Sequence, residues 1–307
     1  MRTGRLIPKV MILCFLSTAV LATTAVEMFQ RSQVSDTHVS YRGMKTVTLS
    51  CQGGPTTAVF KVIHLRPSKT RTDYFAPEVL SGVIVIQDGP VIWRYSPSQS
   101  SWRQLHCPNL PLQATLSQEA LENFDLRLVG SDRLAGRPVY VIYAVPKCPG
   151  EAARRLWIDR ENYVVMGTQV ESPSGRVVNK SQFTKIEFNP ANISPSIFKI
   201  SGKIEEPAKP AQPASFKVLK PTYIPAGYRL IGMGSLTIQQ LTCVHLQYSN
   251  GVSTISLFER KADPEPIAPR VDGKLLNVYT WTRGGIHFTL IGSVPRSELR
   301  RMAGSLP

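Results

Sequence analysis

The chain has 307 residues, of which 42% are hydrophobic and 19% charged, and it carries a formal net charge of +15. This length favours two domains with packed cores, and the 24 prolines favour short elements and turns over long helices. The basic residues are not gathered into a face or module typical of nucleic-acid binding, so we expect no nucleic acid among the partners.

The first 25 residues have the order of a secretory signal peptide. Arg2, Arg5 and Lys9 precede an apolar stretch, and small residues follow from Ala22 to Ala25, which predicts cleavage after Ala22 or Ala25. The apolar stretch is short for a membrane-spanning helix, which needs roughly 20 residues. An uncleaved N-terminal anchor is the alternative. In either case we expect the remaining chain to work outside the cytoplasm, in the periplasm or at the membrane surface.

Residues 26–202 are predicted to form one domain, an antiparallel sheet with few helices. Asp88-Gly89 is typical of a hairpin turn between strands at 83–86 and 91–95. Periodic apolar residues predict a helix over 115–126. Asp159 and Glu161 fall at a predicted hairpin turn, where we expect solvated carboxylates. Further strands are expected at 41–51, 59–65, 70–75, 102–105, 139–145, 155–159, 164–171 and 177–188.

Residues 203–215 are rich in proline, alanine and charge, which predicts a semi-extended linker. Residues 216–307 are predicted to form a smaller α+β domain. Its strands include a hairpin with the strong turn signal Asn250-Gly251. Its last helix begins near Pro295 and directs Leu299 and Met302 inward.

Several segments of the first domain resemble the lipoprotein-carrier (LolA-like) superfamily. They are VIWRYSPSQSSW (91–102), LAGRPVYVIYAVP (134–146), RRLWIDRENYVV (154–165) and NPANISPSIFKI (189–200). The second domain is similar to that of the RseB/MucB sigma-E regulators in PTYIPAGYRLIG (221–232), VHLQYSNGVSTISLFERK (244–261) and PRSELRRMAGSL (295–306). Asn250 and Val252 stand where that pattern has Asp and Leu, and the four cysteines after residue 25 lie outside the pattern.

The resemblance implies an α+β protein in which a LolA-like curved antiparallel half-barrel is linked to a smaller domain ending in a helix. It also implies a non-enzymatic exported regulator. Such a protein binds the extracytoplasmic part of a membrane-spanning anti-sigma factor and senses lipid or lipoprotein in an apolar cavity. The alternative is a periplasmic lipid or lipoprotein carrier without a signalling role. The basic charge also fits an anionic membrane surface.

Aromatic residues are the candidates for the walls of a lipid cavity, which needs apolar side chains and few polar groups. An ordinary place in the core of the sheet is the alternative for each of them. The candidates are Trp93, Tyr95, Trp102, Tyr140 and Trp157.

No catalytic motif, metal-ligand spacing or cofactor-binding motif stands out, so we expect neither an active site nor a metal or cofactor, and an envelope hydrolase is the least favoured class. Cys51, Cys107, Cys148 and Cys243 permit two disulfides in an exported chain, with three possible connectivities. Cys107 and Cys148, which flank proline-containing turns of one domain, form the preferred pair.

Overall fold

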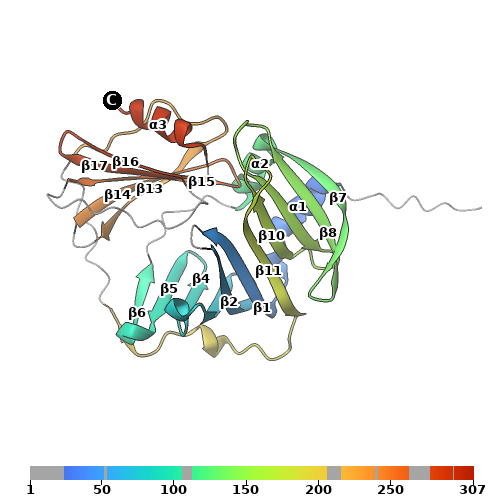
Figure 1. Cartoon of the computed structure of the whole chain (residues 1–307). Helices are drawn as coiled ribbons and strands as arrows, with labels where there is room; N and C mark the ends of the chain where they lie inside the picture. Colours follow the sequence, from blue (N-terminus) through green and yellow to red (C-terminus); the bar gives the residue numbers. More distant parts are fainter. Residues whose placement is uncertain are drawn as a thin grey trace, which may run out of the picture.

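The computed structural model describes residues 24–51, 54–105, 113–205, 216–238, 241–262, 277–292 and 294–307. In these ranges the chain forms two separate sheets, one of twelve strands and one of five (Figure 1). Three α-helices accompany the sheets: α1 (Ala25–His38), α2 (Gln113–Asn123) and α3 (Arg296–Gly304). The predicted α+β class with few helices is confirmed. No helix within these ranges has both the length and the apolar character needed to cross a bilayer.

The twelve-stranded sheet is open and curved, with β4–β6 at one end and β7–β8 at the other (Figure 1). Its order is β12-β6-β5-β4-β3-β2-β1-β11-β10-β9-β8-β7, so hairpins connect most neighbours and β11 returns to pair with β1. All pairs are antiparallel except β12 with β6. The strands are β1 (Tyr41–Cys51), β2 (Gly54–Leu65), β3 (Lys69–Ala76), β4 (Ile84–Asp88), β5 (Val91–Ser96), β6 (Ser101–Leu105), β7 (Phe124–Leu134), β8 (Arg137–Pro146), β9 (Ala153–Asp159), β10 (Val165–Glu171), β11 (Val177–Phe188) and β12 (Lys203–Ile204).

Helix α1 is fastened to this sheet at both ends. Near its start, Met28 and Phe29 are buried against Ile142 and Ile158 of β8 and β9. Near its end, Asp36 accepts a hydrogen bond from the Tyr41 hydroxyl at 3.2 Å and, through its carbonyl, one from His64 Nε2 at 2.7 Å. The Thr24 hydroxyl caps the first turn by accepting from the Glu27 N–H at 3.1 Å. A cut after Ala22 keeps this cap, whereas a cut after Ala25 removes it.

Several elements differ from the sequence-based expectation. Helix α1 and strand β7 were not expected, and the predicted linker begins with the two-residue strand β12. Helix α2 ends at Asn123 rather than at 126, because the chain continues directly into strand β7, which pairs with β8 from Phe124↔Pro146 onward. The polar edge strand β7 lacks the alternation that marks a half-buried strand, since most of its side chains are exposed.

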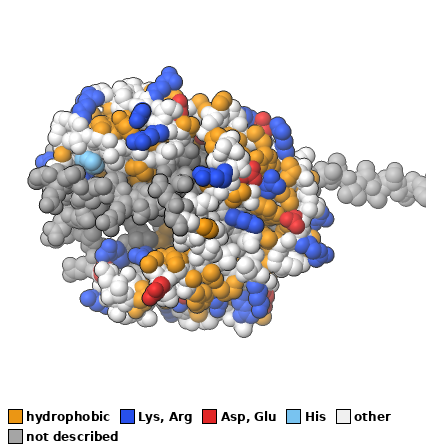
Figure 2. All heavy atoms as spheres, viewed as in Figure 1, with side chains coloured by type: hydrophobic (Ala, Val, Ile, Leu, Met, Phe, Trp, Pro, Cys, Tyr) orange, Lys and Arg blue, Asp and Glu red, His pale blue; other side chains and the backbone are white. Residues whose placement is uncertain are grey.

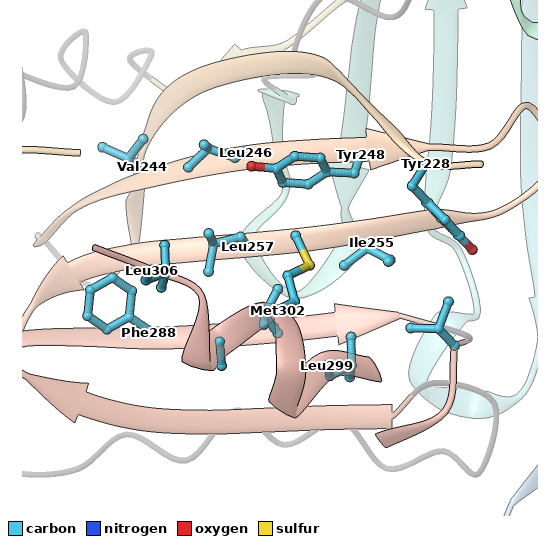
Figure 3. Close-up of a cluster of buried hydrophobic side chains, with 13 residues drawn as sticks. Tyr228, Val244, Leu246, Tyr248, Ile255, Leu257, Phe288, Leu299, Met302 and Leu306 are labelled. Carbon is cyan, nitrogen blue, oxygen red and sulfur yellow. The ribbon is translucent and has the colours of Figure 1, made fainter. Parts of the chain in front are cut away.

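The five-stranded sheet has the order β13-β14-β15-β17-β16 and packs under α3 (Figure 3). Leu299 and Met302 of α3 are fully buried against it, as predicted, among Leu246, Tyr248 and Leu257. Burying one aliphatic side chain of this size stabilises the fold by about 1.5–3 kcal/mol. The strands are β13 (Arg229–Ile238), β14 (Leu241–Ser249), β15 (Thr254–Lys261), β16 (Asn277–Arg283) and β17 (Ile286–Gly292).

Both predicted hairpin turns are present, but they differ in length. The β4–β5 turn is the short one, with Gly89 at φ +57°. The β14–β15 turn has four residues, Asn250–Ser253, and the Asn250 side chain closes it by accepting from the Val252 and Ser253 N–H groups at 3.1 and 2.8 Å.

The prediction that Asp159 is a solvated turn carboxylate is wrong. Asp159 is fully buried, and its two oxygens accept from Arg137 Nε and Nη2 at 2.7 and 3.1 Å. The N–H groups of Glu161 and Asn162 also donate to it. Burial alone would raise the pKa of Asp159, but the hydrogen bonds from Arg137 and from the turn outweigh it, and the net pKa is lowered.

We expect Asp159→Asn to lower the free energy of unfolding at pH 7 by about 2–3 kcal/mol, because Arg137 loses a charged, buried acceptor. The pKa of Asp159 is lower in the folded chain than its ordinary value of 3.8. The ion pair therefore stabilises the fold above about pH 4, and this contribution is lost as the pH falls through the folded pKa. Urea unfolding at pH 7 and pH 3 should show the gap between wild type and variant narrowing at pH 3.

Glu161→Gln is the matched control, because Glu161 also pairs with Arg137 but its side chain is 75% exposed. It should change stability by less than about 0.5 kcal/mol. An equal loss of unfolding free energy in both variants would contradict the stabilising role of the buried Asp159–Arg137 pair. A difference between wild type and Asp159→Asn that does not depend on pH would also contradict it.

Candidate functional site

Three of the five predicted cavity residues form one cluster at the β6 end of the large sheet. Trp93 and Tyr95 of β5 and Trp102 of β6 pack together with Ile86 and Phe198. Tyr95 and Trp102 are directly opposite each other, with ring centroids 5.3 Å apart. Trp102 is buried and its Nε1 donates to the Ser201 carbonyl at 3.0 Å. We call Trp93, Tyr95, Trp102, Ile86 and Phe198 the aromatic cluster.

The other two candidates lie in different parts of the sheet. Tyr140 packs beside Met28 and Phe29 under α1, and the Arg160 guanidinium lies over its ring at 4.9 Å. Trp157 belongs to a third cluster with Tyr41 and Phe183, and its Nε1 donates to Asp132 at 3.1 Å. The structure therefore gathers Trp93, Tyr95 and Trp102 and does not bring Tyr140 and Trp157 to them. A lipid-lining role for any of the five stays a prediction.

An open hollow of about 500 Å³ lies beside the aromatic cluster, between the end of α1 and residues 189–193. Two of its lining residues, Leu65 and Ile193, also pack against the aromatic cluster. The remaining wall is largely polar, and there Asn189 Oδ1 accepts from the Ser40 N–H at 3.2 Å. The hollow is thus lined both by apolar residues that adjoin the aromatic cluster and by hydrogen-bonding groups. The lining residues are His38, Ser40, Leu65, Arg66, Asn189, Pro190, Ala191 and Ile193.

A second candidate region is the junction between the two sheets, which the sequence did not reveal. Asn250, in the β14–β15 turn, is fully buried, and its Nδ2 lies 3.0 Å from each carboxylate oxygen of Glu151. Glu151 sits in the β8–β9 connection and is itself buried. Burial raises the pKa of Glu151, while hydrogen bonds from Tyr228 and Asn250 and the charge of Arg154 act in the opposite direction. A buried carboxylate of one sheet thus depends on an amide of the other.

Further polar contacts surround this pair. Asn123, at the end of α2, donates from Nδ2 to the Gly227 and Asn250 carbonyls, both at 3.1 Å. Arg154 Nη2 donates to the Ser253 hydroxyl at 2.8 Å, and Glu119 forms an ion pair with Arg229. We define the junction as these contacts of α2 and the β8–β9 connection with residues 227–229 and 250–253.

Gly227 shows how closely the two parts approach. It has φ +80°, and a Cβ at this position would lie 2.1 Å from Asn123 Oδ1. The glycine is therefore required both by its left-handed backbone and by the neighbouring side chain. A usable signal in the sequence was Asn250 itself, which replaces the Asp of the family pattern. With Asp at this position, two buried carboxylates would face each other.

The cysteines and histidines add no clear chemical site. Cys148 is a partly exposed thiol and Cys243 is a buried one, whose pKa burial raises to about 11. Cys107 lies outside the described residues, so the Cys107–Cys148 pair stays a prediction. His64 bonds to Thr70 and α1, and His245 stacks on Phe258 with centroids 4.4 Å apart. Within the described ranges, no three His, Cys, Asp or Glu side chains converge as metal ligands would.

Comparison with known proteins places the fold. Residues 80–209 match the model of the MucB/RseB N-terminal domain. This match confirms the expected resemblance to RseB/MucB-type proteins for the curved sheet, and the smaller sheet-and-helix unit shares the fold of the solved MucB structure.

Among individual proteins, the chain is 24% identical over 195 residues to the sigma factor AlgU regulatory protein MucB of Pseudomonas aeruginosa, and this match spans 60% of either chain. It thus covers less than two thirds of that relative. A chain of the solved P. aeruginosa MucA/MucB complex superposes with a TM-score of 0.69 at 16% identity, covering 92% of this chain and 98% of that one. The crystal structure of MucB gives a TM-score of 0.67 at 17% identity, with 92% and 97% covered. At these identities the superpositions establish the fold over both sheets.

We expect Asn250→Asp to destabilise the junction, lowering the free energy of unfolding by about 2–4 kcal/mol at pH 7, because it sets a second buried carboxylate against Glu151. The pKa of Glu151 is already raised, so a proton returns to the pair as the pH falls, and the deficit should shrink toward pH 5. Thermal unfolding of wild type and variant from pH 5 to pH 8 measures this.

The combined variant Asn250→Asp with Glu151→Gln is the control, because it exchanges amide and carboxylate between the two positions. It should recover most of the lost stability at pH 7. If the double variant remains as unstable as Asn250→Asp, the Asn250–Glu151 contact does not stabilise the junction. The same conclusion follows if the loss of stability in Asn250→Asp grows as the pH falls.

Proposed function

We propose that this chain is a non-enzymatic regulator outside the cytoplasm that binds the extracytoplasmic part of a membrane-spanning anti-sigma factor. The observation that carries the proposal is the fold. Both sheets superpose on a chain of the MucA/MucB complex over 92% of this chain, and the matched curated relative is a sigma factor regulatory protein.

The aromatic cluster and the neighbouring hollow support a sensing role for the large sheet. Trp93 and Tyr95 are half-buried beside the buried Trp102, and Leu65 and Ile193, which pack against this cluster, also line the hollow. An acyl chain of a lipid or lipoprotein bound there would have apolar contacts along its length and polar groups near its head. Binding can release the partner only if the ligand has different affinities for the partner-bound and free states.

The charge distribution supports an acidic partner or an anionic membrane surface. The chain carries +15 in total, and Figure 2 shows Lys and Arg side chains spread over the visible face of both parts rather than in one patch. Such a field favours encounter with acidic segments without fixing one site. A specific partner must then be recognised by shape and backbone contacts.

Purification of the chain from native membranes after mild cross-linking, with mass spectrometry of co-purifying protein and lipid, tests the proposal. We expect a single-span protein together with a lipid or lipoprotein. Lipid without such a protein would contradict regulation and favour the carrier. Recovery of neither would contradict both.

Two aromatic substitutions locate the lipid in the same experiment. Trp93→Ala removes a half-buried member of the aromatic cluster, so the bound lipid should fall at least tenfold while the single-span protein is retained. Tyr279→Ala removes a half-buried ring from the five-stranded sheet and should leave the lipid unchanged. Equal lipid in both preparations would place the lipid elsewhere.

A further inference from the structure

The four edges of the two sheets are protected to different degrees. Natural proteins block an open edge with short strands, charges, bulges or covering segments. Strand β12 has only two residues. Strand β7 carries four charged residues and a bulge between Leu128 and Gly130. Strand β16 ends at Arg283, whose guanidinium donates to the carbonyls of Leu306 and Pro307 and so holds the C-terminus against it.

Strand β13 lacks this protection beyond its first residues. The chain contains no charged residue and no proline from Leu230 to Leu241. The one irregularity, between Leu230 and Gly232, lies at the start, and pairing with β14 then runs regularly to Ile238↔Leu241. An edge of this length without charge is a template for another strand.

Two side-chain features also favour an approaching backbone. Gly232 and Gly234 lie in the middle of the strand, and glycine in a strand often marks close approach of another chain. Between them, Met233 is 53% exposed, although it is a large apolar residue. Among the described residues, only those of β14 make backbone hydrogen bonds to residues 231–238. The backbone N–H and C=O groups of β13 that point away from β14 therefore have no backbone partner among the described residues.

We propose that β13 is the docking edge for an extended, uncharged segment of the anti-sigma factor's extracytoplasmic part, which adds a sixth strand to the five-stranded sheet. This inference rests on the proposed function and names the surface it uses. Main-chain hydrogen bonds supply affinity in this mode of recognition, and alternate side chains supply specificity. The strand starts at the junction, where Gly227 and Arg229 contact α2, so a docked segment extends outward from the contact between the two sheets.

The charge of the chain argues against a second copy as the occupant. Without residues 1–25, which contain Arg2, Arg5 and Lys9 and no acidic residue, each copy still carries +12. Two such copies repel each other at close range, and the uncharged β13 edge offers no compensating acidic residue. An extended segment of another protein with flanking acidic residues avoids this repulsion and gains from the surrounding basic field.

Hydrogen–deuterium exchange of the full chain, with and without the purified extracytoplasmic segment of the anti-sigma factor from the same genome, tests the inference. Amides in 231–238 should exchange at least tenfold more slowly in the complex, while those of the other edge strand, β16, should not change. Peptides covering 277–283 provide this internal comparison.

A substitution pair tests the edge by affinity. Met233→Lys combined with Ser235→Lys introduces charges of the kind that protect natural edge strands. We expect this double variant to raise the dissociation constant for the segment at least tenfold. Thr280→Lys places the same charge at an exposed position on β16 and should change it less than twofold. Circular dichroism of each variant verifies that the sheet is intact.

The possible outcomes distinguish a failure of the β13 docking edge from a failure of the proposed function. Tight binding without protection of 231–238, or unchanged binding by the Met233/Ser235 variant, overturns the docking edge and leaves the proposed function standing. Protection of 231–238 in the chain alone that depends on its concentration, with a dimer in sedimentation, identifies a second copy as occupant and also overturns it. Failure of the wild-type chain to bind the segment overturns the proposed function itself.

Discussion

The contact between the two sheets is centred on one buried pair, the amide of Asn250 against the carboxylate of Glu151. A carboxylate without hydrogen-bond donors is costly to bury, and here two of the groups that satisfy it, Asn250 and Tyr228, come from the other sheet. Separation of the sheets would leave that carboxylate without these partners and would also expose the surrounding contacts of Asn123 and Arg154. The two sheets are therefore held in a defined arrangement by specific polar groups rather than by a broad apolar interface alone.

In the function that we propose, this arrangement gives the two sheets different tasks. The aromatic cluster lies at the β6 end of the large sheet. The hollow lies beside the start of β1, the end of β2 and residues 189–193, whereas the junction involves α2 and the β8–β9 connection. A ligand in the hollow would have to act through the curved sheet to change the partner-binding part. Sheets transmit such changes because their packed interiors deform little and shift as units. In this proposal the small sheet, with α3 covering one face and β13 at its edge, is the part that binds the partner.

The sequence predicted those features that depend on local chemistry. Turn residues located both hairpins, and the spacing of Leu299 and Met302 located the buried face of α3, because these signals act over a few residues. Contacts between distant residues were not predictable in this way. Burial of Asp159 depends on Arg137, which lies 22 residues earlier and donates to it. Asn250 belongs to the junction through its contact with Glu151, which is 99 residues away in the chain. Of the five candidate aromatics, three lie together because they belong to the same hairpin, β5–β6. Tyr140 and Trp157 lie apart from them because β8 and β9 are at the opposite end of the strand order from β5 and β6, and no local pattern encodes that order.

The central claim is that the junction holds both sheets in the arrangement that binds an anti-sigma factor. Isothermal titration of the full chain with the extracytoplasmic segment of the anti-sigma factor from the same genome, for wild type, Asn250→Asp and the exchanged Asn250→Asp/Glu151→Gln pair, tests it most directly. The account predicts saturable binding by the wild type, at least tenfold weaker binding by the single variant, and recovery in the exchanged pair. Equal affinities for all three proteins, or no binding by the wild type, would contradict it.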